Sequence, residues 1–138
     1  MELVDFYGLK VPVARGQERP LVKEVIHAEE FHGETGLGHC VLPETGTKAA
    51  SDNAVFFIRE ILDDLPEGQQ VTFIETAPMT NLALLLRVFP EVKDKIRRIV
   101  FMGGAVKGGN VTPAAEFNIY ADPEAAKIVF EAGIPLVM

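Results

Sequence analysis

The sequence predicts an α/β fold with an open, mostly parallel sheet and helices on both of its faces. Short, continuously apolar runs alternate along the chain with longer segments whose apolar residues recur at helical spacing. Runs without in-out alternation are typical of strands buried on both faces, and their alternation with helices indicates parallel strands joined by helical crossovers. We expect one domain over residues 1–138, because this length can bury a sizeable core.

The first predicted elements are a helix end, a strand and a long loop. Residues 1–7 carry an apolar stripe, and Gly8 after them is a typical C-cap residue. A short apolar run that ends in glycine predicts a strand over residues 10–16. Residues 27–51 contain several glycines and Pro43, which predicts a long loop of the kind that is usually functional or mobile.

A helix and a second strand are predicted after this loop. Ser51 and Asp52 are suited to cap the helix, whose apolar residues fall on one helical face. These apolar residues are Val55, Ile58, Ile61, Leu62 and Leu65. The helix is expected to end at Pro66, and residues 71–75 predict the strand.

The same alternation continues through the middle of the chain. Thr80 is suited to cap a helix over residues 81–89, which Pro90 interrupts. Residues 91–95 predict one further turn, and residues 99–102 predict an apolar strand that two glycines close.

The last predicted helix has the clearest start in the sequence. Residues 122–124, Asp-Pro-Glu, combine an N-cap, a proline at the first helical position and an acid in the first turn. A helix over residues 125–132 is expected to end at Gly133, before a buried strand over residues 134–138. The whole order of elements predicts a Rossmann-like sheet.

Composition narrows the class of protein. The chain has 13 Lys and Arg against 20 Asp and Glu, and its net charge of −7 argues against nucleic acid or an anionic membrane as a partner. No apolar run approaches the roughly 20 residues of a membrane span. Residues 1–30 show no basic n-region followed by an apolar h-region, so we expect no signal peptide. Cys40, the one cysteine, has no partner for an internal disulfide. We therefore expect a cytoplasmic protein.

Three segments follow the ends of predicted strands, where open parallel sheets bind their ligands. They are residues 75–81, 102–105 and 108–118. Residues 103–110 resemble a phosphate-binding loop but fail both templates. Ala105 stands where the dinucleotide pattern needs glycine, and Lys-Ser/Thr is absent after Gly108.

The third segment is the most unusual. If it is extended, Glu116 and Asn118 point to one side, and Phe117 and Ile119 point to the other. Asn110 lies nearby along the loop. A carboxylate beside carboxamides suits hydroxyl groups, which both donate and accept hydrogen bonds. The alternative is a polar loop whose side chains bond to its own backbone.

The histidines of the long loop favour a lid over a metal site. His32, Glu34, His39 and Cys40 could ligate a metal, but their spacing matches no compact zinc pattern. A glycine-rich lid that closes over a ligand is the better interpretation, and a plain surface loop is the alternative.

At these segments the chain resembles the inosine-uridine preferring nucleoside hydrolase family. The matching stretches follow the family's order and cover nearly the whole chain. They are residues 11–16 (VPVARG), 32–38 (HGETGLG), 76–81 (TAPMTN), 100–104 (VFMGG), 109–118 (GNVTPAAEFN) and 122–126 (DPEAA). Residues 116–118 (EFN) together with residues 122–126 are the specific part of this match.

The resemblance implies an enzyme that cleaves the N-glycosidic bond of ribonucleosides with a calcium ion in its pocket. It implies that Thr76 offers calcium a carbonyl oxygen and that Asn110 and Glu116 hold the 5′-hydroxyl. It also implies that Asn118 and the region of Met102 approach the ribose from the other side. Its further implication is that His32 lies on a lid over the base.

The departures from the family pattern bear on activity. The family's Asp-Thr-Asp-Pro-Gly-x-Asp-Asp motif, which supplies most calcium ligands and the general base, is absent, and Ala77 replaces a usual glycine. The sequence also ends before the family's His-Asp pair. One neutral carbonyl should not hold calcium. We therefore expect this chain alone to bind no calcium and to be inactive.

Three hypotheses remain open from the sequence. The favoured one is a central fragment of a nucleoside hydrolase, because a helix is cut at Met1 and a strand at Met138. The second is a non-catalytic ribose- or nucleoside-binding module. The third is one part of a split enzyme whose open sheet edges accept a complementing chain, and a homo-oligomer is also compatible with the sequence.

Overall fold

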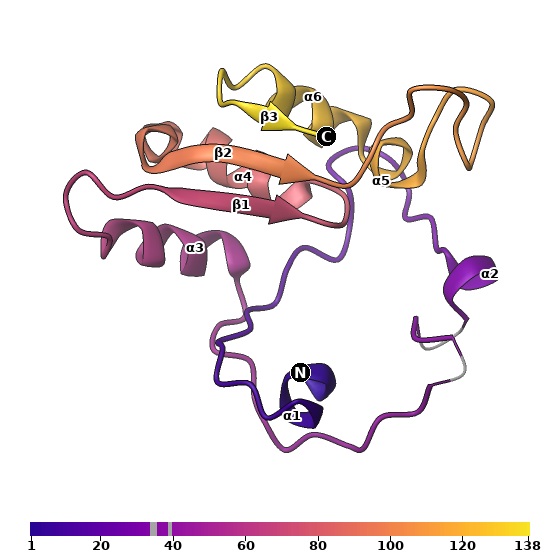
Figure 1. Ribbon diagram of the computed structural model, residues 1–138, viewed down its shortest axis with the longest axis horizontal. Helices are drawn as coiled ribbons and strands as arrows, with labels where there is room; N and C mark the ends of the chain where they lie inside the picture. The colour runs from indigo at the N-terminus through magenta and orange to yellow at the C-terminus, as the bar shows by residue number, and fades with distance from the viewer. Residues whose placement is uncertain (34–35, 39) are drawn as a thin grey trace.

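The computed structural model describes residues 1–33, 36–38 and 40–138 (Figure 1). Glu34 and His39, two of the metal ligands considered above, lie outside the described residues. The helices and strands follow in the order α1 (Glu2–Phe6), α2 (Glu29–His32), α3 (Ala54–Asp63), β1 (Val71–Glu75), α4 (Thr80–Val88), the 3₁₀ helix η1 (Pro90–Lys95), β2 (Ile96–Phe101), α5 (Phe117–Ala121), α6 (Pro123–Phe130) and β3 (Leu136–Val137).

The three strands form one open parallel sheet in the order β1-β2-β3, which confirms the predicted α/β class. Val71 pairs with Ile96, and a shift of register follows, so that Glu75 pairs with Phe101 at the carboxyl end. Strand β1 has the predicted bounds. Strand β2 begins three residues before the expected position, at Ile96, and β3 comprises only Leu136 and Val137.

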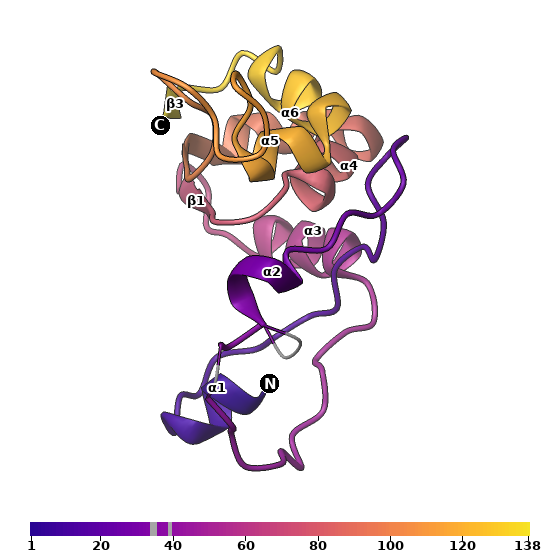
Figure 2. The ribbon, with the colours of Figure 1, turned by 90° about the vertical axis from the view of Figure 1, so that its right-hand side faces the viewer.

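In place of helices on both faces, the described helices around the sheet lie together on one face (Figure 2). Helix α4 contacts both α3 and α6, so these three form a single layer. The strand order explains this arrangement. Right-handed crossovers that step in one direction, from β1 to β2 to β3, put every connecting helix on the same side. On the other face, the side chain of Ile74 is 73% exposed.

The core lies between this helix layer and the sheet. Leu82 and Leu85 of α4 are almost completely buried, as are Ile99 of β2 and Val129 of α6. Burial of these side chains removes apolar surface from water and stabilises the contact between helices and sheet. This packing fixes the carboxyl ends of β1 and β2 relative to the chain that follows each strand.

Helix α3 forms as predicted, but a different residue caps it. The Asn53 side-chain oxygen accepts hydrogen bonds from the backbone N–H groups of Val55 and Phe56, at 3.0 and 3.3 Å. Ser51 instead accepts a bond from the N–H of Asn53, so it supports the cap. Ile61, which we expected on the buried face, is 43% exposed.

The predicted strand over residues 10–16 is wrong. This segment makes only an isolated bridge, between Ala14 and Ser51, with bonds from Arg15 N–H to the Ser51 carbonyl and from Ala50 N–H to the Val13 carbonyl. An apolar run becomes a strand only where a partner runs alongside it for several residues. Among the described residues, the chain near Ser51 offers that partner for one residue only.

The N-terminal helix agrees with its prediction. Helix α1 is followed by Gly8 with a φ of +63°, the left-handed conformation that favours glycine. It stands away from the sheet, and none of its residues is buried (Figure 1). Among the described residues, no helix is both long and apolar enough to cross a bilayer.

Candidate functional site

The site begins where β1 and β2 end side by side. The N–H of Met102 donates to the carbonyl of Glu75 at 2.8 Å, which extends the pairing of the two strands by one step. The residue after β1, Thr76, therefore lies beside the residue after β2, Met102. Both are exposed. Parallel strands present their carboxyl ends at one edge, so two loops meet at this point.

The side chain of Asn118 joins these two strand ends. Its amide nitrogen Nδ2 lies 3.0 Å from the Met102 carbonyl oxygen and 3.4 Å from the Thr76 carbonyl oxygen, and it donates to both. It also lies 3.1 Å from the Met102 sulfur. The carboxamide of Asn118 thus holds three of the predicted site residues together.

Glu116 lies at the start of α5, where the structure corrects the predicted extended conformation. Glu116 itself is extended, but the helix begins at Phe117. The Glu116 carboxylate accepts hydrogen bonds from the backbone N–H groups of Asn118 at 3.0 Å and Ile119 at 3.4 Å. Free N–H groups at a helix start favour such an acceptor, so this cap explains why the chain is helical here.

The same carboxylate connects α5 to the loop after β2. Its Oε2 atom accepts a hydrogen bond of 3.0 Å from the N–H of Gly104, and the Glu116 residue is only 7% exposed. Gly104 has a φ of +75°, which turns the chain so that its N–H faces the carboxylate. A buried carboxylate with these backbone donors is held rigidly at the edge of the sheet.

Asn110 reaches the same helix start from the loop. Its side-chain oxygen accepts a hydrogen bond of 2.8 Å from the N–H of Phe117. The backbone around it folds tightly, because the N–H of Asn110 donates to the Ala115 carbonyl at 3.1 Å. A Cβ atom on the preceding Gly109 would overlap the backbone of Ala115, so this position requires glycine.

Thr76, Met102, Asn110, Glu116 and Asn118 form what we call the polar cluster. Its side chains make hydrogen bonds to the local backbone and also keep free hydrogen-bonding groups. Within the described residues, the amide nitrogen of Asn110 and the carboxamide oxygen of Asn118 have no hydrogen-bond partner. The carboxylate of Glu116 has further acceptor positions. A donor, a neutral acceptor and a charged acceptor at one edge match the hydrogen-bonding pattern of sugar hydroxyl groups.

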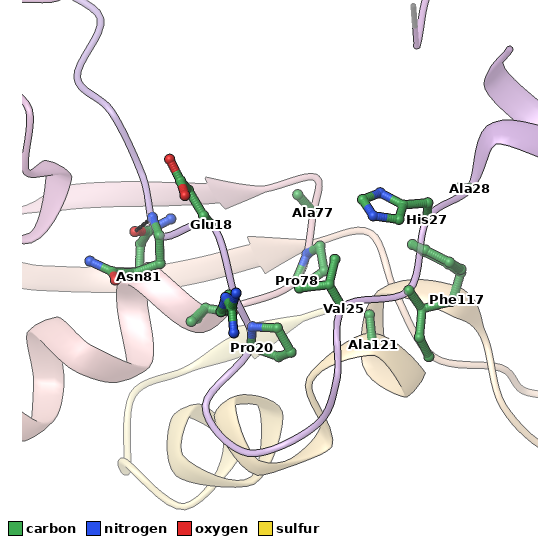
Figure 3. Close-up of a pocket in the computed structure, with 14 residues that line it drawn as sticks. Glu18, Pro20, Val25, His27, Ala28, Ala77, Pro78, Asn81, Phe117 and Ala121 are labelled. Atoms are coloured by element: carbon green, nitrogen blue, oxygen red, sulfur yellow. Dashed lines mark hydrogen bonds between the residues drawn. The ribbon is translucent and has the colours of Figure 1, made fainter. Parts of the chain in front are cut away.

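A cavity of about 350 Å³ adjoins this cluster. One wall is the crossing segment, which we define as residues 17–28, and the other wall comes from the chain after β1 and from α5 (Figure 3). The lining includes Glu18, Val25 and His27 from the crossing segment and Pro78, Asn81 and Phe117 from the other wall. Phe117 lies between Glu116 and Asn118 in sequence, so the cavity and the polar cluster share one turn of chain.

The structure brings five of the six predicted site residues together and leaves one apart. Hydrogen bonds connect Thr76, Met102, Asn110, Glu116 and Asn118, directly or through α5. His32 is exposed at the end of α2, which lies apart from the strand ends (Figure 1). His27, five residues earlier, lines the cavity instead. The sequence held no spacing signal that would have distinguished the two histidines.

The residues around the Thr76 carbonyl do not complete a calcium site. Calcium takes six to eight oxygen ligands, usually with several carboxylates. The Thr76 carbonyl oxygen is already an acceptor for Asn118, and the Glu116 carboxylate is bonded to backbone N–H groups. The described residues contain no group of three or more His, Cys, Asp or Glu side chains arranged to hold a metal.

Glu75 is the titratable group nearest the strand ends whose pKa is clearly displaced. It is the last residue of β1, on the same face as the half-buried Val71 and Phe73. Burial disfavours the charged form and raises the pKa of its carboxyl group from 4.5 to about 6. The neutral acid is therefore favoured in the folded protein between these two values.

This displaced pKa predicts a pH-dependent stability. The contribution of the Glu75 carboxyl group to the free energy of unfolding is fully present below pH 4.5, where the group is protonated in both states. It is lost as the pH rises through about 6. A shift of this size corresponds to roughly 2 kcal/mol. We expect the free energy of unfolding of Glu75→Gln to lack that part of the decrease between pH 4.5 and 7, as measured by urea denaturation. Identical pH profiles for the two proteins would show that Glu75 titrates normally.

Comparisons of sequence and structure match this chain to nucleoside hydrolases. The family model described as inosine-uridine preferring nucleoside hydrolase matches residues 1–138. The pyrimidine-specific ribonucleoside hydrolase RihA of Salmonella typhimurium is 52% identical over 130 residues, which are 94% of this chain and 41% of that protein. The chain thus spans about two fifths of the length of this curated relative.

Solved structures show the same similarity in three dimensions. The purine-preferring ribonucleoside hydrolase from Gardnerella vaginalis superimposes with a TM-score of 0.88 at 35% identity, over 98% of this chain and 44% of that one. A plant nucleoside hydrolase, the PpNRh1 enzyme, gives a TM-score of 0.83 at 35% identity, over 97% of this chain and 43% of that one.

Proposed function

Because this chain belongs to the inosine-uridine preferring nucleoside hydrolase family, we propose that it carries the sugar-binding part of an active site that hydrolyses ribonucleosides to base and ribose. One observation supports this function most directly. A carboxylate, Glu116, and two carboxamides, Asn110 and Asn118, gather where β1 and β2 end. Open parallel sheets bind their ligands at this edge.

The resemblance to the family assigns each group a role, and the free hydrogen-bonding capacity of each group is compatible with that role. The amide nitrogen of Asn110 donates to the 5′-hydroxyl of the ribose, and the Glu116 carboxylate accepts from it. Asn118 and the chain at Met102 contact the ribose from the other side. Rigidly held contacts of this kind accelerate glycosidic cleavage when they bind the distorted, positively charged sugar more tightly than the ground state.

The calcium chemistry of the family needs ligands beyond these residues. A calcium ion would supply an activated water as the nucleophile, and the resemblance assigns Thr76 to it as a carbonyl ligand. The groups around Thr76 do not form such a site by themselves. We therefore expect no saturable calcium binding by this chain in calorimetry, and no release of base from uridine or inosine.

The sugar site is tested by calorimetric titration with methyl β-D-ribofuranoside, a probe locked in the furanose form. We expect saturable binding, and roughly tenfold weaker binding of the matched 5-deoxy sugar, because one hydroxyl contact to a charged group is lost. Equal affinities for the two sugars would contradict the roles of Asn110 and Glu116. Base release in the hydrolysis assay would show that a group in this chain activates water.

Pyrimidine ribonucleosides are the first substrates to test. The relative at 52% identity is named as pyrimidine-specific, whereas the solved structure named as purine-preferring is 35% identical. We expect uridine to bind more tightly than inosine in the same titration. Tighter binding of inosine would contradict the preference for pyrimidine ribonucleosides. It would not contradict the proposed sugar-binding role of the polar cluster.

A second candidate is a sugar-binding part that associates with further polypeptide to complete the enzyme. The bare face of the sheet supports it, because Ile74 is 73% exposed and Val137 is 45% exposed there. Strands of a parallel sheet are usually covered on both faces. Light scattering over a range of concentrations would detect self-association, and a monomer at every concentration would exclude a complex between copies of this chain.

A further inference from the structure

Asp122 is the most deeply buried charged side chain among the described residues. It is 0% exposed, and it accepts three hydrogen bonds. Its Oδ2 atom accepts from the hydroxyl of Thr80 at 2.6 Å and from the N–H of Leu21 at 3.0 Å, and its Oδ1 atom accepts from the N–H of Ala125 at 3.0 Å. A buried carboxylate with this set of donors is well satisfied.

These three bonds join parts of the chain that are far apart in sequence. The bond to Ala125 caps α6, which the sequence predicted. The bond from Thr80 corrects its predicted role, because the hydroxyl donates to Asp122 and does not cap α4. The bond from Leu21 spans 101 positions and attaches the crossing segment to the end of α5.

Beside the packing of Leu21 against the core, polar contacts at Gln17 and Lys23 also attach the crossing segment. The N–H of Gln17 donates to the side-chain oxygen of Asn81 at 2.9 Å. The ammonium group of Lys23 donates to the Tyr120 carbonyl at 2.6 Å and lies 3.5 Å from the centre of the Tyr120 ring. Both attachments lie at the protein surface or are only partly buried. The attachment at Leu21 lies between these two in sequence, and its acceptor, Asp122, is fully buried.

The position of this attachment bears on the cavity. Asp122 directly follows α5, whose first residue, Phe117, lines the cavity, and whose second residue, Asn118, belongs to the polar cluster. The opposite wall is the crossing segment, including His27 (Figure 3). The bond between Leu21 and Asp122 therefore connects one wall of the cavity to the end of the helix that begins the other wall.

We infer that Asp122 is a positioning residue. Its buried carboxylate holds the crossing segment against α5 and keeps open the cavity beside the polar cluster. This cavity takes the non-sugar part of the ligand. The positional claim stands on the hydrogen bonds of Asp122 alone. Its consequence for ligand binding rests on the proposed function.

The substitution Asp122→Ser separates the two roles of this side chain. Serine is a good N-cap, so its hydroxyl can still accept from the N–H of Ala125. It is too short to reach the N–H of Leu21 as well. The matched control is Thr80→Val, which removes the side-chain donor to Asp122 and leaves the bond to Leu21 in place. Lys23→Met removes an attachment without disturbing the core.

Amide hydrogen exchange followed by NMR tests the positional claim. In Asp122→Ser we expect exchange at Leu21 and its neighbours in the crossing segment to accelerate by at least about tenfold, because a bond to a charged acceptor is lost. We expect a smaller acceleration in Lys23→Met and none there in Thr80→Val. These accelerations should exceed any change at core amides such as those of Ala83 and Ala126.

Two results would overturn the inference. One is exchange of the crossing segment at the wild-type rate in Asp122→Ser. The other is acceleration by the same factor in the crossing segment and at Ala83, which is the behaviour of a residue that only stabilises the whole fold. If Asp122→Ser does not fold, a wild-type exchange rate in Lys23→Met would count against anchoring by these contacts, and a local acceleration would support it.

Ligand titrations test the functional consequence. In Asp122→Ser we expect the affinity for uridine to fall at least about fivefold more than the affinity for methyl β-D-ribofuranoside, because only the base lies between the two walls. Equal losses would refute this part of the inference. If the wild-type chain binds neither probe, the proposed function fails, and the exchange result still decides the positional role of Asp122.

Discussion

Replacement of Glu116 by alanine is expected to weaken binding of methyl β-D-ribofuranoside by about 100-fold or more and to lower the free energy of unfolding by about 2–3 kcal/mol. Both effects have one cause. In the proposed site the carboxylate is the charged acceptor for a sugar hydroxyl, and in the structure it accepts hydrogen bonds from the N–H groups of Gly104, Asn118 and Ile119. Its removal leaves these donors unpaired at a buried position. Calorimetry and urea denaturation measure the two effects.

The matched variant Glu116→Gln separates binding from stability. Its side-chain oxygen can still accept from the N–H groups of Gly104 and Asn118, so we expect most of the stability to remain. The loss of charge should still weaken sugar binding by about tenfold. Wild-type affinity in a folded Glu116→Ala protein would place the sugar elsewhere. Equal loss of stability in both variants would show that the charge itself holds α5.

Replacement of Asn118 by alanine is expected to weaken sugar binding by about 10- to 100-fold and to lower stability by less than about 1 kcal/mol. The binding loss follows because the carboxamide oxygen offers the sugar an acceptor beside the strand ends. The stability loss is small because Thr76 and Met102 are exposed, so water can replace the amide at their carbonyl oxygens. Calorimetry measures the loss of binding, and urea denaturation measures the loss of stability.

Asn118→Asp is the informative control for this position. A carboxylate would face the carbonyl oxygens of Thr76 and Met102 with an acceptor where the wild-type protein has a donor. We expect it to bind the sugar no better than Asn118→Ala and to be less stable. If Asn118→Asp keeps wild-type affinity, the amide nitrogen does not orient this side chain for binding.

The two variants at Glu116 and Asn118 test different connections of one cluster. Glu116 ties α5 to the loop after β2, whereas Asn118 ties α5 to the ends of both strands. Because the two side chains sit on the same turn, their effects on binding should not add. A double variant that loses the full sum of both effects would indicate two independent contacts.

Part of this structure follows from local chemistry that the sequence displays. The start of α6 was predictable because an aspartate followed by proline satisfies free N–H groups three residues away, and the structure shows the bond from Ala125. The helix end before Gly8 and the strand over residues 71–75 were predictable for similar reasons of short range. The family was also predictable, because its specific stretches, residues 116–118 and 122–126, are short and continuous in the chain.

Other features depended on partners that are distant in sequence. Residues 10–16 have the composition of a strand but meet their partner for a single residue at Ser51. Thr80 has the composition of a helix cap, but a buried carboxylate 42 positions away takes its hydroxyl. The expected extended conformation after Glu116 was overridden because the side chain of Glu116 turns back onto the N–H groups that follow it.

The sequence by itself therefore determined the fold class, the family and the polar residues that line one edge of the sheet, because each is encoded in short continuous stretches. Only the tertiary structure decided how those residues are held and which histidine lies beside them. That choice depends on the path of the crossing segment, whose Leu21 N–H donates to the buried Asp122 carboxylate. A hydrogen bond across 101 positions leaves no periodic or local pattern in the sequence, so the position of His27 at the cavity emerged only from the folded chain.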